Sequence, residues 1–264
     1  MHLVDTHCHL NMMQSEQNLD QIIENARKNG IYRIMVPGLD LESSLEAVRI
    51  AEKYDLVYAA IGFHPNDANK WNKESFTLLR ELAQHQKVKA IGEIGLDFYR
   101  DYVPQSIQIH VFGEQLRLSE ETGLPIIIHS RNALNNIFEV LFKWKKMSPL
   151  NKTNQYAGIL HAFEGNFEQA KLITNYNFFI GMGGPVTYKN AHDKHEIVKN
   201  IPINSILLET DSPFLTPHPL RGKPNEPANI KFIAEKIAKL TEKPLKWVSE
   251  ETSKNANKIF AWEH

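Results

Sequence analysis

LVDTHCHL, Leu3 to Leu10, is a short apolar run that ends in two histidines placed two residues apart. Because alternate residues of a β-strand point to the same side, His7 and His9 are predicted to lie together, with Asp5 behind them. Alone, this pair is a weak metal signal, since same-side histidines are more often hydrogen-bonded surface groups. The pair becomes informative because other apolar runs of the chain also end in histidine or carboxylate.

Short apolar runs alternate with longer amphipathic segments along the chain. The runs are rich in Val and Ile and continuously apolar, which is typical of parallel strands with both faces covered. They are 2–7, 32–38, 57–65, 88–97, 125–130, 157–163, 177–184 and 205–213. The predicted helices are Asn18–Asn29, Leu41–Lys53, Lys73–His85, Gln105–Thr122, Asn132–Lys146, Phe167–Thr174 and Ala191–Asn200, with two more after the last run. This alternation predicts an α/β fold, a single (β/α)8 TIM-like barrel that takes up residues 1–264 as one domain.

Glycine and proline positions support this division of the chain. Gly30 and Gly123 each stand between a predicted helix and the next strand, where a left-handed residue commonly ends a helix. The alternative fold is a doubly wound open sheet, which normally carries a Gly-rich phosphate loop after an early strand. VPGLD, Val36 to Asp40, has too few glycines for such a loop. The Pro-rich stretch Phe214 to Pro227 is predicted to be a shaped loop, because only helices follow it.

Charge and cysteine content limit the class of protein. Lys and Arg number 30 and Asp and Glu number 31, so a net charge of -1 provides no overall field that would attract nucleic acid or an anionic membrane. A single cysteine excludes an internal disulfide, and we find neither a signal pattern nor a membrane-spanning run. We therefore expect a cytoplasmic protein without a membrane partner. Nothing in the sequence indicates an obligate protein partner or a particular oligomeric state.

Imidazole and carboxylate groups recur at the C-terminal ends of the predicted strands, which form the catalytic face of such a barrel. The residues are His7, His9, His64, Glu93, His129, His161 and Asp211. These are ligands for a divalent cation, Mg, Mn or Zn, and the lack of thiolates argues against a structural zinc or iron–sulfur site. Even six of these seven ligands would be too many for one four-coordinate ion. They would serve two ions about 3.5–4 Å apart that share a carboxylate, for which we favour Glu93.

Each ligand candidate also has an interpretation without a metal. Glu93 could cap the next turn, and Asp211 could be the N-cap of the turn that follows it. His129 and His161 could be core histidines bonded to the backbone. These interpretations compete with ligation one by one, but together they leave the repetition at strand ends unexplained. The sharper hypothesis for Asp211 is a ligand that also accepts a proton from bound water.

Two further carboxylates lie on the same strands as ligand candidates. Asp5 and Glu209 each stand two residues before a candidate on the same predicted strand face. They are therefore expected either to orient the ligands or to form a polar layer inside the barrel, and the sequence favours neither interpretation.

In chain order, these motifs resemble the TatD family of metal-dependent deoxyribonucleases, which belong to the amidohydrolase-like barrels. The motifs run from Val4 to Pro227 and read DTHCHL, GFHP, GEIGLD, IHSR, HAF, ETDSP and RGKPNEP. Each motif is short, but their succession at strand ends is specific. The resemblance implies a TIM-like barrel, two divalent metal ions and hydrolysis of phosphodiester bonds in DNA, often as an exonuclease.

The resemblance also implies roles for individual residues. One metal ion would be held by His7, His9, Glu93 and Asp211, and the other by Glu93, His129 and His161. Of these, Asp211 and Glu93 would be catalytic, with Asp211 orienting the attacking hydroxide. Substrate phosphate would be approached by His64, Arg131, Arg221 and Lys223, while Asn225 and Glu226 shape the mouth. The departures from the family's usual pattern are Asn11, Asn132, Ala162 and Glu164, of which Glu164 adds negative charge near a site for a polyanion.

Two other functions are compatible with this ligand set. A binuclear metallohydrolase of an amide, ester or lactone would use the same hydroxide, and a fold does not determine a substrate. Cationic residues in PHPLRGKPNEP favour the phosphodiester, because a neutral amide would not need them. A noncatalytic metal- or nucleic-acid-binding barrel is the third hypothesis, and the presence of Asp211 as a proposed base argues against it. The expected substrate is therefore DNA or a nucleotide.

Overall fold

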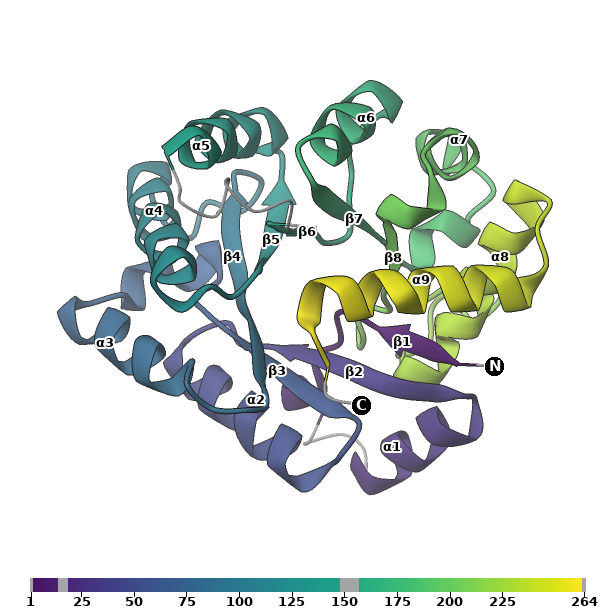
Figure 1. Cartoon of the computed structure of the whole chain (residues 1–264), viewed down its shortest axis with the longest axis horizontal. Helices are drawn as coiled ribbons and strands as arrows, with labels where there is room; N and C mark the ends of the chain where they lie inside the picture. Colours follow the sequence, from purple (N-terminus) through teal and green to yellow (C-terminus); the bar gives the residue numbers. More distant parts are fainter. Residues whose placement is uncertain (1, 14–18, 148–156, 263–264) are drawn as a thin grey trace.

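The computed structural model describes residues 2–13, 19–147 and 157–262. It confirms the predicted barrel, because an eight-stranded sheet pairs in parallel in the order of the sequence and curls into a nearly closed ring with helices outside it (Figure 1). The strands are β1 Leu3–Asp5, β2 Ile31–Pro37, β3 Val57–Ile61, β4 Val88–Asp97, β5 Ile126–Arg131, β6 Gly158–Leu160, β7 Phe178–Met182 and β8 Ile206–Leu208.

The helices follow the predicted segments with small changes at their ends. They are α1 Leu19–Lys28, α2 Leu41–Lys53, α3 Lys73–Leu82, α4 Gln105–Thr122, α5 Leu134–Met147, α6 Phe167–Asn175, α7 His192–Asn200, α8 Ile230–Thr241 and α9 Leu245–Phe260. The predicted first residue of α1, Asn18, lies outside the described residues. No helix in the described ranges is long and apolar enough to cross a membrane.

Local sequence signals account for the helix boundaries. The Asp40 side chain accepts a bond from the backbone N–H of Ser43, and the Ser43 hydroxyl bonds back, so a capping box starts α2. Gly123 ends α4 with a φ of 72°, and Gly30 follows α1 with a φ of 82°. Both glycines therefore adopt the left-handed conformation predicted for them.

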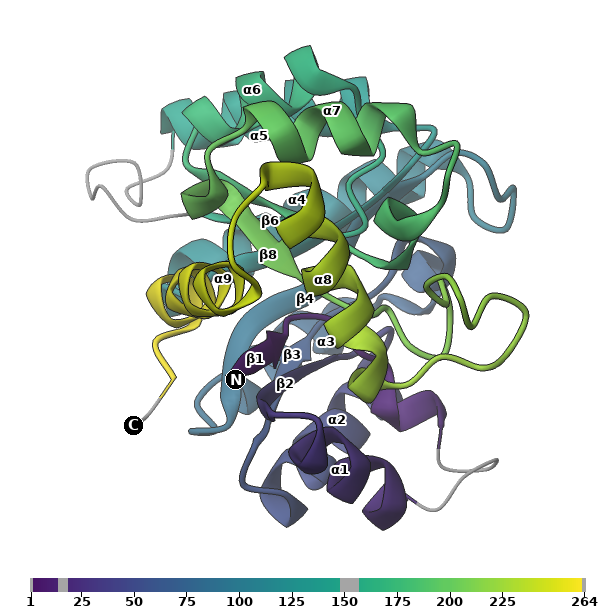
Figure 2. The ribbon, with the colours of Figure 1, turned by 90° about the vertical axis from the view of Figure 1, so that its right-hand side faces the viewer.

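Apolar side chains fill two separate layers. The larger layer packs the outside of the sheet against the helices, and the smaller one fills the barrel. The inner layer includes Met35, Ile127 and Phe179 from the strands together with Phe260 and Trp262 from the end of the chain. Helix α9 reaches the N-terminal ends of the strands, since the Asn255 side chain donates to the Ile206 carbonyl over 2.8 Å (Figure 2). This helix therefore closes the bottom of the barrel.

Strands β1 and β8 meet along a seam formed by residues 6–9 and 208–212. The Thr6 N–H donates to the Leu208 carbonyl over 3.0 Å and the Asp211 N–H to the His7 carbonyl over 2.8 Å. The His9 N–H donates to the Ser212 carbonyl over 2.8 Å. Both strands are shorter than predicted, and the prediction that His7 and His9 lie within the first strand is wrong. The seam bonds hold these residues instead, after the regular ladders have ended.

Candidate metal centre

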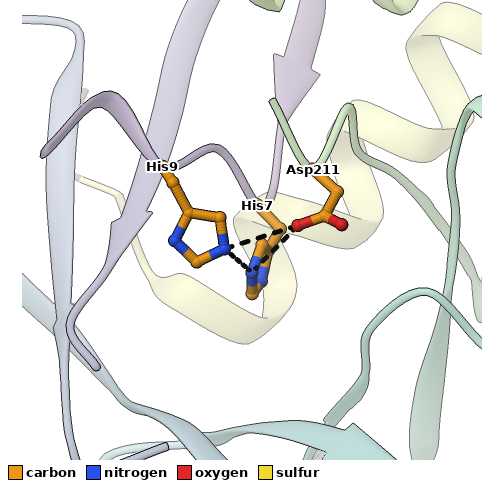
Figure 3. Close-up of side chains that lie close together, drawn as sticks. All are labelled: His7, His9 and Asp211. Carbon is orange, nitrogen blue, oxygen red and sulfur yellow. Dashed lines mark hydrogen bonds and ion pairs between the residues drawn. The ribbon is translucent and has the colours of Figure 1, made fainter. Parts of the chain in front are cut away.

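The seam brings His7, His9 and Asp211 together at the C-terminal end of the barrel (Figure 3). The Nε2 atoms of His7 and His9 are 3.2 Å apart, and Asp211 Oδ1 lies 3.7 Å from the first and 3.4 Å from the second. Asp211 has a φ of 54°, a left-handed conformation that is strained for a residue with a Cβ and is common at functional sites. The predicted pairing of the two histidines on one side is confirmed.

Glu93 lies between this group and a second group of histidines. Its Oε2 is 3.3 Å from Nε2 of His7, while its Oε1 is 2.8 Å from Nε2 of His161 and 2.8 Å from Nδ1 of His129. Glu93 lies inside β4, which extends to Asp97 as the predicted run 88–97 does, so the placement of Glu93 at a strand end is wrong. A Cβ at Gly95 would lie 2.1 Å from the His129 carbonyl oxygen, so this glycine permits the close approach of β4 and β5.

His64 belongs to the same cluster, although the family resemblance implied a role at substrate phosphate. Its Nδ1 accepts the Asn66 N–H over 3.1 Å, and its Nε2 lies 3.6 Å from Oε1 of Glu93. His64, Glu93 and His129 form one of the groups whose ligand atoms are close enough to hold an ion, beside His7, Glu93 and His161. The structure therefore makes His64 a further ligand candidate.

The donor set fits a bound cation. Two imidazole nitrogens at 3.2 Å, both facing carboxylate oxygens in a buried site, gain more from a shared positive charge than from one another. Burial, followed by the effect of His161, lowers the pKa of His7 to about 4, which keeps its imidazole in the neutral form that binds metals. Burial opposes the ionisation of Glu93, but the surrounding histidines, His161 foremost, hold its pKa well below the usual range.

The remaining groups also respond to the local negative charge. Burial opposes a charge on His161, yet the Glu93 carboxylate raises the pKa of His161 to about 10. Asp211 is buried as well, and the hydrogen bond with His9 leads the interactions that lower its pKa. The carboxylates of Glu93 and Asp211 are therefore ionised and attract a positive charge, which a proton on His161 or a metal ion can supply.

Asp5 and Glu209 hold the backbone beside the ligand candidates rather than their rings. Asp5 accepts the Thr210 N–H over 2.9 Å and the Thr210 hydroxyl over 2.6 Å, which anchors the residue before Asp211. Glu209 Oε1 accepts the N–H of Ala162, the residue after His161. A Cβ at residue 181 would lie 2.2 Å from Glu209 Oε2, so Gly181 provides the space for this carboxylate.

A pocket of about 520 Å³ opens over the cluster. The predicted residues that line it are His9, His64, Glu93, His129, Arg131, His161 and Asp211. Among the described residues, the lining does not include Arg221 or Lys223. Arg221 packs instead with its guanidinium carbon 4.6 Å from the ring centre of Tyr188. Of the predicted phosphate-binding residues, His64 and Arg131 thus reach the pocket.

Several lining residues were missed by the reasoning from sequence. Asp97 Oδ2 is 3.3 Å from Nε2 of His129, and Asn66 donates to the same oxygen over 3.2 Å. Arg100, Tyr102, Phe214 and Leu215 also line the pocket. Asp97 ends the predicted strand 88–97, so its position at a strand end was a usable signal. The loop residues carried no comparable signal.

Among the departures from the family pattern, Glu164 is tied to the backbone. Its Oε1 accepts the N–H of Asn132 over 3.0 Å, and the side chain does not line the pocket within the described part of the chain. Asn11 donates to the Pro37 carbonyl over 2.9 Å. Both departures therefore have local structural partners.

Comparison with known proteins points to one family. Residues 4–261 match the family described as TatD related DNase. The chain is 43% identical over 258 residues to the uncharacterized metal-dependent hydrolase YabD of Bacillus subtilis, covering 98% of both chains. It is 32% identical to the 3'-5' ssDNA/RNA exonuclease TatD of Cronobacter sakazakii, covering 98% of this chain and 97% of the relative.

A solved structure agrees with these sequence matches. The crystal structure of YJJV, a TatD homolog from Escherichia coli K12, superimposes with a TM-score of 0.90 at 29% identity. The match covers 99% of this chain and 98% of that one. The likeness therefore extends over the whole barrel.

Proposed function

The chain belongs to the family of TatD-related DNases, and on this premise we propose that it is a divalent-metal-dependent hydrolase that cleaves phosphodiester bonds of DNA or of a nucleotide. The observation that carries this proposal is the position of Glu93, whose two oxygens face different histidines of the cluster. One carboxylate shared in this way is the arrangement that two-ion hydrolases use.

We assign the cluster to two ions. His7, His9, Glu93 and Asp211 would hold the first, and Glu93, His129 and His161 the second, with His64 beside the second group. The choice among Mg, Mn and Zn depends on supply as well as on ligands, because nitrogen-rich sites bind late first-row metals tightly. Divalent ions bound here would supply an acidified water and would neutralise the charge of a phosphodiester.

The protein's own groups have separate tasks in this proposal. Asp211 is ionised, lies at the pocket surface and can accept a proton from the attacking water. The Arg131 guanidinium can pair with two phosphate oxygens, which stabilises charge that develops on them. Arg221 and Lys223 would meet the substrate only beyond the pocket.

The relatives named as 3'-5' ssDNA/RNA exonucleases lead us to propose single-stranded nucleic acid ends as the substrate. The purified protein should release nucleotides from single-stranded DNA in Mn²⁺ or Mg²⁺, and elemental analysis should find the ions. The test variant is Asp211→Asn, and the control is Asp193→Asn on the exposed side of α7. Equal rates for wild type and Asp211→Asn in both metals would refute the nuclease.

The same preparation addresses the alternative substrates. Suppose that wild type hydrolyses an ester, lactone or amide, that Asp211→Asn loses this activity, and that neither cleaves DNA. The site would then be assigned to a carbonyl substrate. That result would be compatible with the proposed metal ligands but would contradict the proposed phosphodiester substrate.

A further inference from the structure

Exposed aromatic side chains gather on one face of the molecule. Tyr99 is 61% exposed, Tyr102 is 69% exposed and Phe214 is 49% exposed, and all three lie in loops that follow β4 or β8 at the catalytic end. Of the exposed large aliphatic residues, five lie on helices, namely Leu45 on α2, Leu78 on α3, Ile107 and Ile109 on α4, and Leu172 on α6, whereas Met12 lines the pocket. Large aromatic rings left in water on one rim indicate a binding surface.

Two of these rings reach the pocket itself. Tyr102 and Phe214 line it together with Glu93 and Asp211, although they come from loops that follow different strands. The ring centre of Phe214 is 6.1 Å from that of His9, at an interplanar angle of 71°. An aromatic ring therefore stands beside the candidate metal ligands.

The third ring already has a partner. The guanidinium carbon of Arg131 lies 3.9 Å from the ring centre of Tyr99, which is cation–π distance and holds the arginine at the pocket wall. Arg100 lies at 6.0 Å from the ring centre of Tyr102, the outer limit of such a contact. Within the described residues, neither Tyr102 nor Phe214 has a ring stacked parallel on it. The contacts these two rings make are the distant Arg100 over Tyr102 and the edge-to-face His9 ring at Phe214, which leave parallel stacking positions for a ligand.

We propose that Tyr102 and Phe214 stack on nucleobases next to the phosphodiester that is cleaved, and that this stacking selects unpaired strands with little regard to base sequence. This inference rests on the proposed function and adds the residues that bind the bases. Every base has a π-face, so stacking tolerates any sequence, but a base inside a duplex is already covered by its neighbours. Arg131 and Arg100 on the pocket wall supply positive charge for the adjacent phosphates.

The test uses the full-length protein and oligonucleotides of one length and sequence. One oligonucleotide carries all its bases, one has abasic sites in its last nucleotides, and one is a blunt duplex. Dissociation constants are measured by fluorescence anisotropy in Ca²⁺, and KM and kcat in Mn²⁺. The variants are Tyr102→Ala, Phe214→Ala and Tyr102→Phe, and Leu172→Ala is the matched loss of an exposed apolar side chain away from the pocket. Phe214→Leu replaces Phe214→Ala in these measurements if the melting temperature of the alanine variant is too low for the assay.

Each alanine variant should raise the dissociation constant and KM for the base-bearing strand about 5- to 150-fold, which corresponds to about 1–3 kcal/mol per stacked base. The abasic strand should bind equally to wild type and variants, and Tyr102→Phe and Leu172→Ala should match wild type. Equal losses on base-bearing and abasic strands would overturn the inference, as would no loss on either. A change of oligomeric state in Tyr102→Ala with unchanged base dependence would also overturn it and assign the rings to a protein contact.

These results separate the stacking from the proposed function. If wild type binds the base-bearing strand more tightly than the abasic strand but cuts neither, the stacking proposal is supported and the proposed nuclease function is contradicted. If wild type cuts both strands with equal KM, the nuclease stands and stacking fails.

Discussion

The two ends of the barrel are built from the same strands, but one end is packed with apolar side chains and the other carries titratable side chains. At the N-terminal end, helix α9 brings Phe260 and Trp262 onto Tyr58, and the ring centres of Trp262 and Tyr58 are 4.6 Å apart. At the C-terminal end, buried histidines and carboxylates face an open pocket. Buried charged groups are unfavourable unless they are paired, so the apolar end must supply stability that the other end does not. Stability and chemistry are thus expected to respond to different substitutions.

The largest expected effect is on the catalytic end. Asp211→Asn should lower the rate of single-stranded DNA cleavage about 100- to 10,000-fold, because it removes the carboxylate that can accept a proton. Its melting temperature should be slightly below that of wild type, because the lowered pKa of Asp211 means that the fold favours the ionised carboxylate that the variant lacks. Rates measured in Mn²⁺ and calorimetry test both parts. A variant that loses activity by unfolding would erase the contrast between the two ends.

A substitution at the N-terminal end of the barrel, which α9 closes, should affect stability and leave catalysis unchanged. Phe260→Ala should lower the free energy of unfolding by about 3–5 kcal/mol, because it leaves a cavity in the inner apolar layer. At a temperature where the variant remains folded, kcat should equal that of wild type. Urea denaturation and steady-state kinetics measure the two quantities. A fall in kcat without a loss of stability would mean that the ends are coupled.

A pH effect is expected from Glu209, which lies below the metal ligands. Burial, opposed by the attraction of His161, raises the pKa of Glu209 to about 7 from the model-peptide value near 4.5. The folded chain therefore holds a proton that the unfolded chain has lost, so stability falls as pH rises from about 4.5 to about 7.

This decline amounts to about 3 kcal/mol at most, since each pKa unit is worth about 1.4 kcal/mol. Glu209→Gln should remove this share of the decline, while the share of Asp5, whose pKa burial raises to about 8, should remain. Urea midpoints at pH 5 and pH 8, in chelator so that metal binding does not contribute, make the measurement. An unchanged slope in Glu209→Gln would show that other groups cause the decline.

The smallest expected effect compares two arginines. Arg131→Ala should raise KM for single-stranded DNA about 10-fold or more, because a hydrogen bond to a charged group is worth about 1.5–3 kcal/mol. Arg221→Ala should change KM less, since Arg221 packs on Tyr188 outside the pocket. Equal effects of both variants would extend the binding surface onto the loop that carries Arg221.

Sequence alone predicted the barrel because its signals are local. The ten residues of β4 match the predicted run 88–97, and the glycine at 123 caps its helix as expected. The positions of His7 and Asp211 were predicted correctly as a pair, yet their strands end earlier. The residue at which a strand ends depends on hydrogen bonds between distant segments, and the hydrophobic pattern of the sequence does not indicate those bonds.

The aromatic rim and the closure by α9 could not be predicted for a related reason. Tyr102 stands in an irregular loop, and its orientation follows from how β4 leads into α4 rather than from any repeat in the sequence. Trp262 reads as one apolar residue near the chain end, and only the packing of α9 shows that it fills the barrel. The single-domain boundary 1–264 and the roles of the individual ligands stay predictions.

Because of the seam, the candidate metal site can form only when both the first and the last strand of the barrel are present. Thr6 and Leu208, which the seam joins, are 202 residues apart, so a chain that has not yet received its eighth strand has no Asp211 beside His7 and His9. A ribosome-bound intermediate or a truncated product would carry the first two histidines without their partner. Ion binding at the finished site would then act as a clasp between the first and last strands and would favour the closed barrel over its open precursors. An unfinished copy would therefore lack the carboxylate that we propose accepts the proton from water.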